Sequence, residues 1–241
     1  MRALSLVLLS VFGLSGTALA GKRHTVWAYP PGAGPKGSVE LETWVTASRA
    51  NGNSGTNSEY RVEIENGLTD DISLDVYLAV LKQTPEEGTK FDRVQASLRA
   101  NLFKKRLGNA IDLTGYFEIE RDIDFANAWE FEAILIGGKS YGRFSYDFNM
   151  VYESEISSSA FQKNTRELRG IVGFGYEVTP QLWAGGEFVA ENAAGGVREF
   201  SIGPTVSIGL TPKTWLAIGP QFGLNDDTDH VKVRALFGIF F

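Results

Sequence analysis

The last eleven residues, VKVRALFGIFF (231–241), have the residue pattern from which the fold is predicted. Every second residue is apolar, from Val231 and Val233 through Phe237 to Phe241, whereas Lys232 lies in the alternate set. Because successive side chains of a β-strand point to opposite sides, this alternation predicts a strand with one apolar face and one partly polar face.

The same period of two recurs along most of the chain, and no segment has a convincing helical period. We predict an all-β chain of about twelve strands, at residues 38–48, 59–66, 72–81, 93–102, 112–120, 129–136, 143–153, 167–178, 182–191, 199–210, 215–224 and 231–241.

The connections between these segments alternate between long polar loops and tight turns. Residues 49–58 and 82–92 are long loops, whereas residues 137–141, 179–181 and 211–213 are turns. An up-and-down meander with its long loops at one end is typical of outer-membrane barrels, whereas a soluble sandwich has no reason to sort its loops. A sheet in hydrocarbon must also close on itself to pair its edges. We therefore predict a closed antiparallel up-and-down transmembrane β-barrel.

The first residues have the features of an export signal. Arg2 precedes an apolar run, and Ala18 and Ala20 are the small residues that signal peptidase recognises. We expect residues 1–20 to be a cleaved signal peptide, residues 21–37 a periplasmic N-terminal segment and residues 38–241 the barrel. An uncleaved anchor is the alternative. No later stretch reaches the roughly 18 consecutive apolar residues that a membrane helix needs.

Together, these features resemble Gram-negative outer-membrane β-barrel proteins of the porin-like type. The terminal Phe241 is similar to the aromatic signal that the barrel-assembly machinery reads in that class. The resemblance implies a place in the cell outer membrane, reached through the periplasm, with lipid, lipopolysaccharide and the assembly machinery as partners. Twelve-stranded members include narrow oligosaccharide and nucleoside channels and a phospholipase, and no motif ties this chain to one of them.

Composition excludes several classes of function. The 241 residues include no cysteine, which excludes a disulfide scaffold, a zinc–thiolate site, an iron–sulfur cluster and a cysteine nucleophile. The net charge of −6 argues against a nucleic-acid partner. His24 and His230 are expected at opposite ends of the barrel, with no serine fixed beside either. We therefore expect no enzyme and no cofactor.

Three short motifs match known sites, and the barrel explains each of them better. Residues 32–37 fit G-x-G-x-x-G, but a strand follows instead of a helix, so we expect a turn. Residues 138–142 fit G-x-S-x-G between two strands, so we expect a hairpin turn. Asn225, Asp227 and Asp229 have calcium-loop spacing without its glycine and final glutamate, so we expect a solvated outer loop and no metal site.

The inward-facing positions carry the distinctive chemistry, because by alternation they receive acids and bases at about two to one. An excess of carboxylates in a water-filled lumen favours cations. The residues that we expect to line the lumen and meet a solute are Glu40, Glu42, Arg61, Glu63, Arg99, Glu118, Glu130, Arg143, Asp147, Arg169, Glu187 and Arg234.

Two functions remain open at this stage. The first is a narrow porin-like channel for small hydrophilic solutes, with cations favoured. The second is a non-conducting structural or surface-recognition barrel whose charges fill the interior, since twelve strands lie between packed and open barrels. The segment that begins at Trp27 either folds back into the inner mouth, extends into the periplasm or meets another envelope component. Trp183 and Trp215 either line the inner mouth or are turned outward by a bulge.

Overall fold

The fold is given by a computed structural model that describes residues 23–52, 55–103, 111–123, 129–157, 160–161, 165–192 and 194–241. The expected signal peptide, residues 1–20, lies outside the described residues. Among the described residues, no helix has the length and apolar character needed to cross a bilayer.

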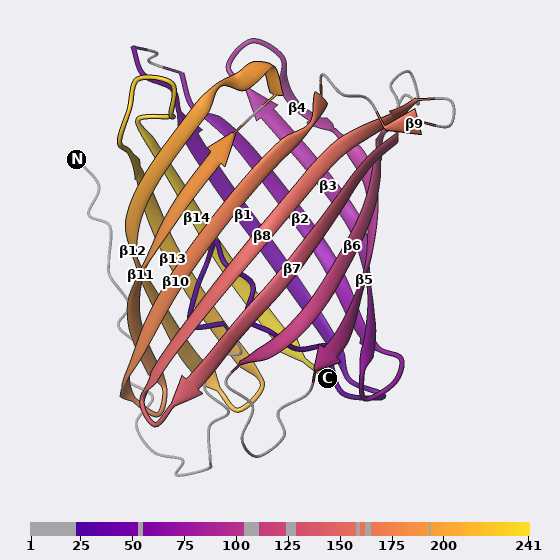
Figure 1. The fold of residues 1–241 in the computed structure, drawn as a ribbon, viewed down its shortest axis with the longest axis vertical. Coiled ribbons are helices and arrows are strands. Elements are labelled where there is room, and N and C mark those ends of the chain that lie inside the picture. Colours follow the sequence, from indigo (N-terminus) through magenta and orange to yellow (C-terminus); the bar gives the residue numbers. More distant parts are fainter. Residues whose placement is uncertain are drawn as a thin grey trace, which may run out of the picture.

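The described chain is almost entirely β-structure (Figure 1). A single turn of 3-10 helix, Ala194–Gly196, lies between two of the strands. The strands are β1 Val39–Arg49, β2 Asn57–Gly67, β3 Ile72–Thr84, β4 Gly88–Phe91, β5 Arg93–Phe103, β6 Asp112–Asp122, β7 Trp129–Tyr141, β8 Phe144–Ser157, β9 Ala160–Phe161, β10 Glu167–Thr179, β11 Leu182–Asn192, β12 Arg198–Thr211, β13 Thr214–Gly223 and β14 Val231–Phe240.

Twelve of the strands in the described residues form a closed antiparallel ring. The first and last strands pair from Glu40 opposite Phe240 to Arg49 opposite Val231, and β8 pairs directly with β10. The short strands β4 and β9 pair only with β3 and β8, respectively, at the end that carries the long loops. The predicted closed barrel is confirmed.

The partition of side chains is the reverse of that in a soluble protein. Met150 and Val172 are 63% and 55% exposed, whereas Asp147 and Glu63 are 1% and 0% exposed. Apolar side chains thus cover the outside, where a bilayer would contact them, and ionisable ones face inward. Phe174, which a two-sheet sandwich would bury, is 52% exposed.

The inward and outward alternation breaks once in β3, and one prediction is wrong there. The sequence pattern puts Val80 outward with Val76, but Val80 is fully buried. The pairing passes from Val62 opposite Ala79 to Glu63 opposite Tyr77, so the strand contains one extra residue at this point. Such a β-bulge shifts the phase of every following side chain.

Two of the expected connections are instead strand. Residues 82–92 form a hairpin extension, in which β3 continues to Thr84 and β4 folds back with Phe91 opposite Leu81. Residues 137–141 belong to β7, and the turn consists of Gly142 and Arg143. Gly142 has a φ of +58°, in the left-handed region that glycine adopts without strain.

The other two motif matches are structural. At the G-x-G-x-x-G match, the N–H of Ser38 donates to Pro35 O at 2.9 Å, which closes a turn just before β1. In the loop after β13, Asn225 Nδ2 donates to Arg198 O at 2.6 Å, and Asn225 Oδ1 accepts the N–H of Phe200 at 3.2 Å. Asn225 therefore ties its loop to β12.

Candidate functional site

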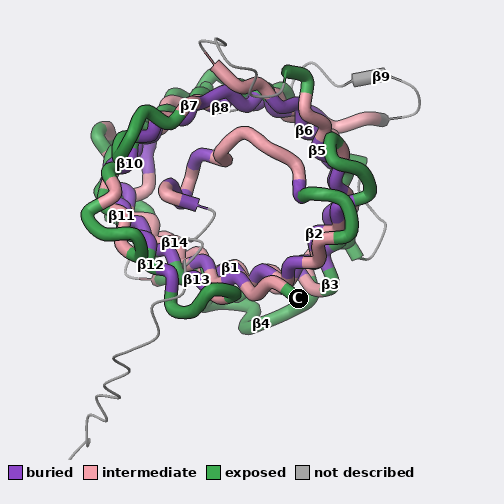
Figure 2. Tube along the Cα trace, turned by 90° about the horizontal axis from the view of Figure 1, so that it is seen from below, coloured by how far each residue is buried: buried purple, intermediate pink, exposed green. Residues whose placement is uncertain are grey.

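Residues 23–37, here called the lumen segment, lie inside the barrel. Figure 2, which views the ring along its axis, shows this stretch crossing the interior before it joins β1. The segment contains no strand. Its contacts run from positions beside the short turns, such as Thr114 of β6, to the middle of strands, such as Glu187 of β11, so it occupies the lumen from the short-turn end to about its middle.

Glu187, on the inner face of β11, holds the middle of the lumen segment. Its Oε2 accepts the N–H of Val26 at 2.9 Å, and its Oε1 accepts the N–H groups of Trp27 at 2.8 Å and Ala28 at 2.6 Å. Glu187 is 2% exposed. A carboxylate that accepts several backbone N–H groups in a buried site makes strong, charge-assisted hydrogen bonds. It therefore anchors a segment that has no secondary structure of its own.

Uncharged side chains of other strands continue this anchoring. Asn149 of β8 pairs with both backbone groups of Tyr29, accepting its N–H at 2.6 Å and donating to its carbonyl at 2.9 Å. Thr114 of β6 accepts the N–H of Gly32 at 2.8 Å. The barrel wall thus replaces the backbone partners that a strand or helix would supply.

The start of the lumen segment makes a second set of polar contacts. His24 Nε2 lies 2.7 Å from Asp147 Oδ2, and the Thr25 hydroxyl donates to the same oxygen at 3.1 Å. The ring of His24 also lies 5.3 Å from that of Trp183. Asp147 therefore fixes this end of the segment against β8.

Guanidinium groups stack on the aromatic rings of this region. Arg23 lies 4.5 Å from the ring centre of Tyr29 and 4.7 Å from that of Trp44. Arg234 lies 4.2 Å from the ring centre of Trp27. Each contact has the geometry of a cation–π interaction. The pKa of the Tyr29 phenol is raised to about 12, mainly because the ring is buried, so the phenol stays uncharged.

Glycines hollow the barrel wall where the lumen segment touches it. A Cβ on Gly173 would lie 2.6 Å from Thr25 Cγ2, and a Cβ on Gly219 would lie 3.1 Å from Val26 Cβ. Larger residues at these inward positions would collide with the segment. The glycines of β10 and β13 therefore provide the space that the segment occupies.

The long-loop half of the lumen contains two cavities, of about 380 and 180 Å³. Trp27 lines both of them, and Tyr29 lines the smaller, so the lumen segment forms part of their boundary. About half of the residues in their walls are acids or bases. We call this half of the lumen the vestibule.

The acids of the vestibule are concentrated on β6, β7 and β8. Glu118 is directly opposite Glu132, which is directly opposite Glu153. Like charges at directly opposed strand positions destabilise a sheet. This acidic row therefore lowers the stability of the sheet unless cationic side chains lie beside it. Arg169 meets it from β10, with Nη2 3.3 Å from Glu153 and 3.7 Å from Glu132, and Nε 3.3 Å from Glu191.

Most of the predicted lumen residues are on the inner face, in two groups. The group that meets the vestibule contains Arg61, Glu118, Glu130, Arg169 and Arg234. The group in the short-turn half, around the lumen segment, contains Glu40, Glu42, Glu63, Arg99, Asp147 and Glu187.

Arg143 differs from the other predicted residues. It is exposed in the turn between β7 and β8, its Nη2 donates to Val178 O, and its guanidinium lies 5.3 Å from the ring centre of Tyr176. Tyr176 faces outward, with 48% of its surface exposed. The structure therefore places Arg143 outside the lumen, because alternation stops where the strand ends.

The uncharged residues that hold the lumen segment are absent from the predicted set. Asn149 and Thr114 occupy inward positions, and this parity is the signal that identifies them. Trp215 lines the inner mouth, where its Nε1 donates to Glu40 Oε1 at 2.6 Å, and Trp183 also faces inward, against His24. No bulge turns either tryptophan outward.

Comparison with known proteins reveals similarity in structure alone. No protein-family model and no curated protein sequence matches the chain. The NanC porin structure aligns with a TM-score of 0.57 at 8% identity, covering 84% of this chain and 98% of that one. The KdgM porin aligns with a TM-score of 0.52 at 10% identity, covering 85% and 99%. The chain therefore has the fold of outer-membrane porin barrels.

Proposed function

We propose that this chain is a porin-like protein of the outer membrane and that small hydrophilic solutes cross through its lumen. The observation that carries the proposal is the inverted partition of side chains around a closed ring, with ionisable cavities in the vestibule. The similarity in fold to the NanC and KdgM porins supports it, and one structure contains the KdgM porin in complex with disordered oligogalacturonate. We infer no enzymatic activity.

The charges of the vestibule favour cations. Nine carboxylates and six cationic side chains line its two cavities. In a narrow aqueous passage, such an excess attracts cations and repels anions. The acidic row of Glu118, Glu132 and Glu153 concentrates this effect on one wall.

Planar lipid bilayers test the proposal. The refolded protein is expected to produce discrete current steps, and a potassium chloride gradient is expected to give a reversal potential of the cation-selective sign. An absence of current above the lipid background would contradict the channel. A reversal potential of the opposite sign would contradict the cation preference alone.

A triple variant tests whether the vestibule sets the selectivity. Replacing Glu118, Glu130 and Glu132 with Gln is expected to move the reversal potential toward zero, because three inward charges are lost. The control is Glu87→Gln, since Glu87 is exposed in the turn between β3 and β4 and pairs with Lys90 at 2.8 Å. Equal reversal potentials for the two variants would contradict the assignment of the vestibule.

One observation favours the second function, a non-conducting structural or surface-recognition barrel. The lumen segment fills part of the short-turn half and is held there by Glu187 and Asn149. A segment bound in this way narrows the passage. Deletion of the lumen segment, followed by measurement of the conductance, separates the two functions.

A further inference from the structure

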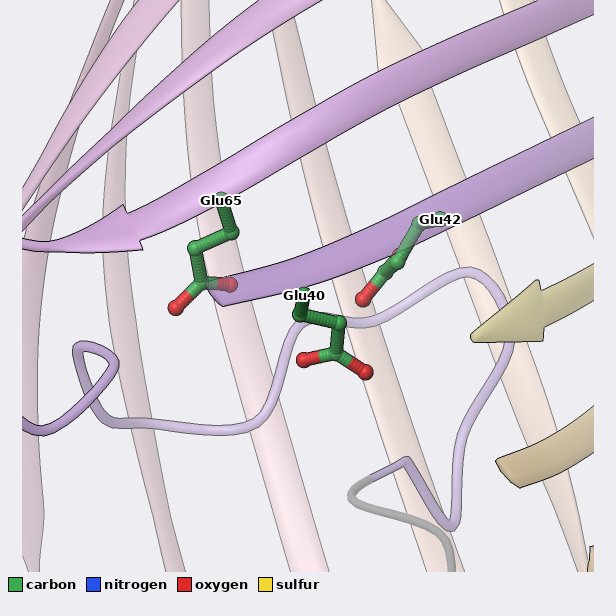
Figure 3. Close-up of side chains that lie close together, drawn as sticks. All are labelled: Glu40, Glu42 and Glu65. Atoms are coloured by element: carbon green, nitrogen blue, oxygen red, sulfur yellow. The ribbon is translucent and has the colours of Figure 1, made fainter. Parts of the chain in front are cut away.

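Four carboxylates lie together on the inner face of β1 and β2. Glu40 is directly opposite Glu65, and Glu42 is directly opposite Glu63. All four residues are buried. Glu40, Glu42 and Glu65 each contribute an oxygen to a group in which these atoms lie within 4.8 Å of one another. Figure 3 shows these three side chains converging beside the lumen segment.

Two guanidinium groups of the described residues contact this acidic cluster. Arg23 Nη2 lies 3.5 Å from Glu42 Oε2, and Arg99 Nη1 lies 4.0 Å from Glu65 Oε2. Arg99 also approaches a fifth carboxylate, with its Nε 3.3 Å from Asp75 Oδ2. Asp75 extends the cluster, because it is directly opposite Glu65 on β3. Within the described part of the chain, these two guanidinium groups contact Glu42, Glu65 and Asp75.

Glu63 provides a second, independent observation. It is 0% exposed, and among the described residues neither of its carboxylate oxygens has a hydrogen-bond partner. It projects from the same inner face as Glu42, directly across the strand pair. A buried carboxylate without a partner is costly in its ionised form, so it takes up a proton or meets a cation.

A cavity of about 230 Å³ lies beside the cluster, with room for an ion and bound water. Its lining consists of Glu42 and Glu65, residues 30–34 of the lumen segment, and the guanidinium side chains of Arg23 and Arg99. At Gly34, a Cβ would lie 2.5 Å from Glu65 Oε1, so glycine allows the segment's backbone to approach this carboxylate.

We propose that Glu40, Glu42 and Glu65 bind a divalent cation, with Glu63 completing the acidic set. Carboxylate oxygens are the donors that hard cations prefer, and calcium accepts six to eight of them in flexible geometry. The ion balances the charge of the cluster and ties residues 30–34 to the wall of the barrel. This inference does not depend on whether the barrel conducts.

Terbium luminescence tests the site directly. Trp215 Nε1 donates to Glu40 at 2.6 Å and Trp44 Nε1 donates to Glu42 at 3.0 Å, so an ion bound here lies close to two indoles. Excitation of tryptophan is expected to produce terbium emission that saturates at one ion per barrel and that calcium suppresses. An absence of saturable emission, or emission that calcium leaves unchanged, would overturn the proposal.

Isosteric variants locate the ion. Glu42→Gln and Glu65→Gln are each expected to weaken terbium binding by about tenfold or more, because a charged ligand is lost while an acceptor oxygen remains. The matched control is Glu132→Gln, which removes an acid of the vestibule row and is expected to leave terbium binding unchanged. Loss of binding in the control but not in the cluster variants would place the ion elsewhere and overturn the proposal.

The Tm of the intact chain provides a test that does not depend on whether a variant folds. Saturating calcium is expected to raise the Tm of the intact chain in detergent, because a ligand bound only by the folded state stabilises it. Magnesium at the same concentration tests whether the site distinguishes the two ions. A Tm that neither ion changes means that protons alone neutralise the cluster, and this would also overturn the proposal.

Discussion

Glu187 is the residue on which retention of the lumen segment depends most directly, because its carboxylate accepts three backbone N–H groups. In Glu187→Gln, an NH₂ group replaces one accepting oxygen and the charge is lost. A buried N–H left without an acceptor costs about 1–3 kcal/mol. The segment should therefore leave its site more often.

Cysteine labelling measures this release, since the natural sequence contains no cysteine. Ala28 is 0% exposed. A thiol introduced by Ala28→Cys is expected to react with a water-soluble maleimide about tenfold or more faster when combined with Glu187→Gln. The matched control is Glu191→Gln on the same strand, because Glu191 pairs with Arg169 in the vestibule. Equal reaction rates in the two backgrounds would contradict the anchoring role.

The contacts of individual residues are only partly predictable from the sequence. The inward position of Glu187 follows from alternation, but its partners Val26, Trp27 and Ala28 do not. They lie some 160 positions earlier in the chain, in a stretch without any periodic pattern. The same alternation predicts an inward Arg143, and this prediction is wrong because Arg143 lies in the turn that precedes β8.

Two outward-facing positions of β10 test where the bilayer lies along the barrel. Val172 and Val178 both face outward, but Val172 lies near the middle of the strand and Val178 near its short-turn end. An arginine on the lipid face costs about 2–4 kcal/mol at the midplane and about 1 kcal/mol or less near the interface. Val172→Arg should therefore destabilise the barrel more than Val178→Arg does.

Equilibrium unfolding by guanidinium chloride in lipid vesicles measures this difference in the free energy of unfolding. The comparison is matched, because both variants make the same substitution on the same face of one strand. Equal losses of stability would mean that the middle of β10 lies no deeper in hydrocarbon than its end.

Strands were the most predictable elements, because the period of two is a local property of the backbone. All twelve segments with this period are strands of the ring. The exception within a strand, Val80, follows a bulge that only the pairing with β2 reveals. The extension of β3 with β4 was missed for a similar reason, since exposed polar residues such as Lys82 and Lys90 have no apolar face to indicate a strand.

Deletion of residues 24–33 tests the whole molecule. The deletion retains the turn from Pro35 to Ser38 and removes the part of the segment that crosses the lumen. The single-channel conductance is expected to increase, because the passage widens and residues such as Glu187 then face water. Conductance in planar bilayers is the measurement, with the intact chain as reference.

The outcome separates the two proposed functions. A larger conductance identifies the segment as the constriction of a channel. If neither the intact chain nor the deletion conducts, the barrel is structural or recognises partners at its surface. An unchanged conductance would mean that solutes bypass the segment, contrary to its position in the lumen.

The architecture of the whole molecule was more predictable than its interior. Closure follows from the apolar outer face and from the cost of open edges in hydrocarbon. The sequence does not predict that the lumen segment fills part of the interior. This segment has no periodic pattern, and its position depends on its contacts with the barrel wall. Small inward-facing residues such as Gly173 and Gly219 are the feature of the sequence that indicates a bound segment.

The pairing of Glu40 with Phe240 joins the two extremes of the barrel sequence. Bringing such distant residues together lowers the conformational entropy of the chain before hydrogen bonds between the two strands can compensate for the loss. Topologies dominated by such contacts therefore form slowly. Until β1 pairs with β14, each of these strands has an edge with unpaired backbone groups, to which a strand of another chain can add. The chain therefore passes through an aggregation-prone stage before the ring closes, and the yield of folded barrel depends on closure being faster than encounters between copies.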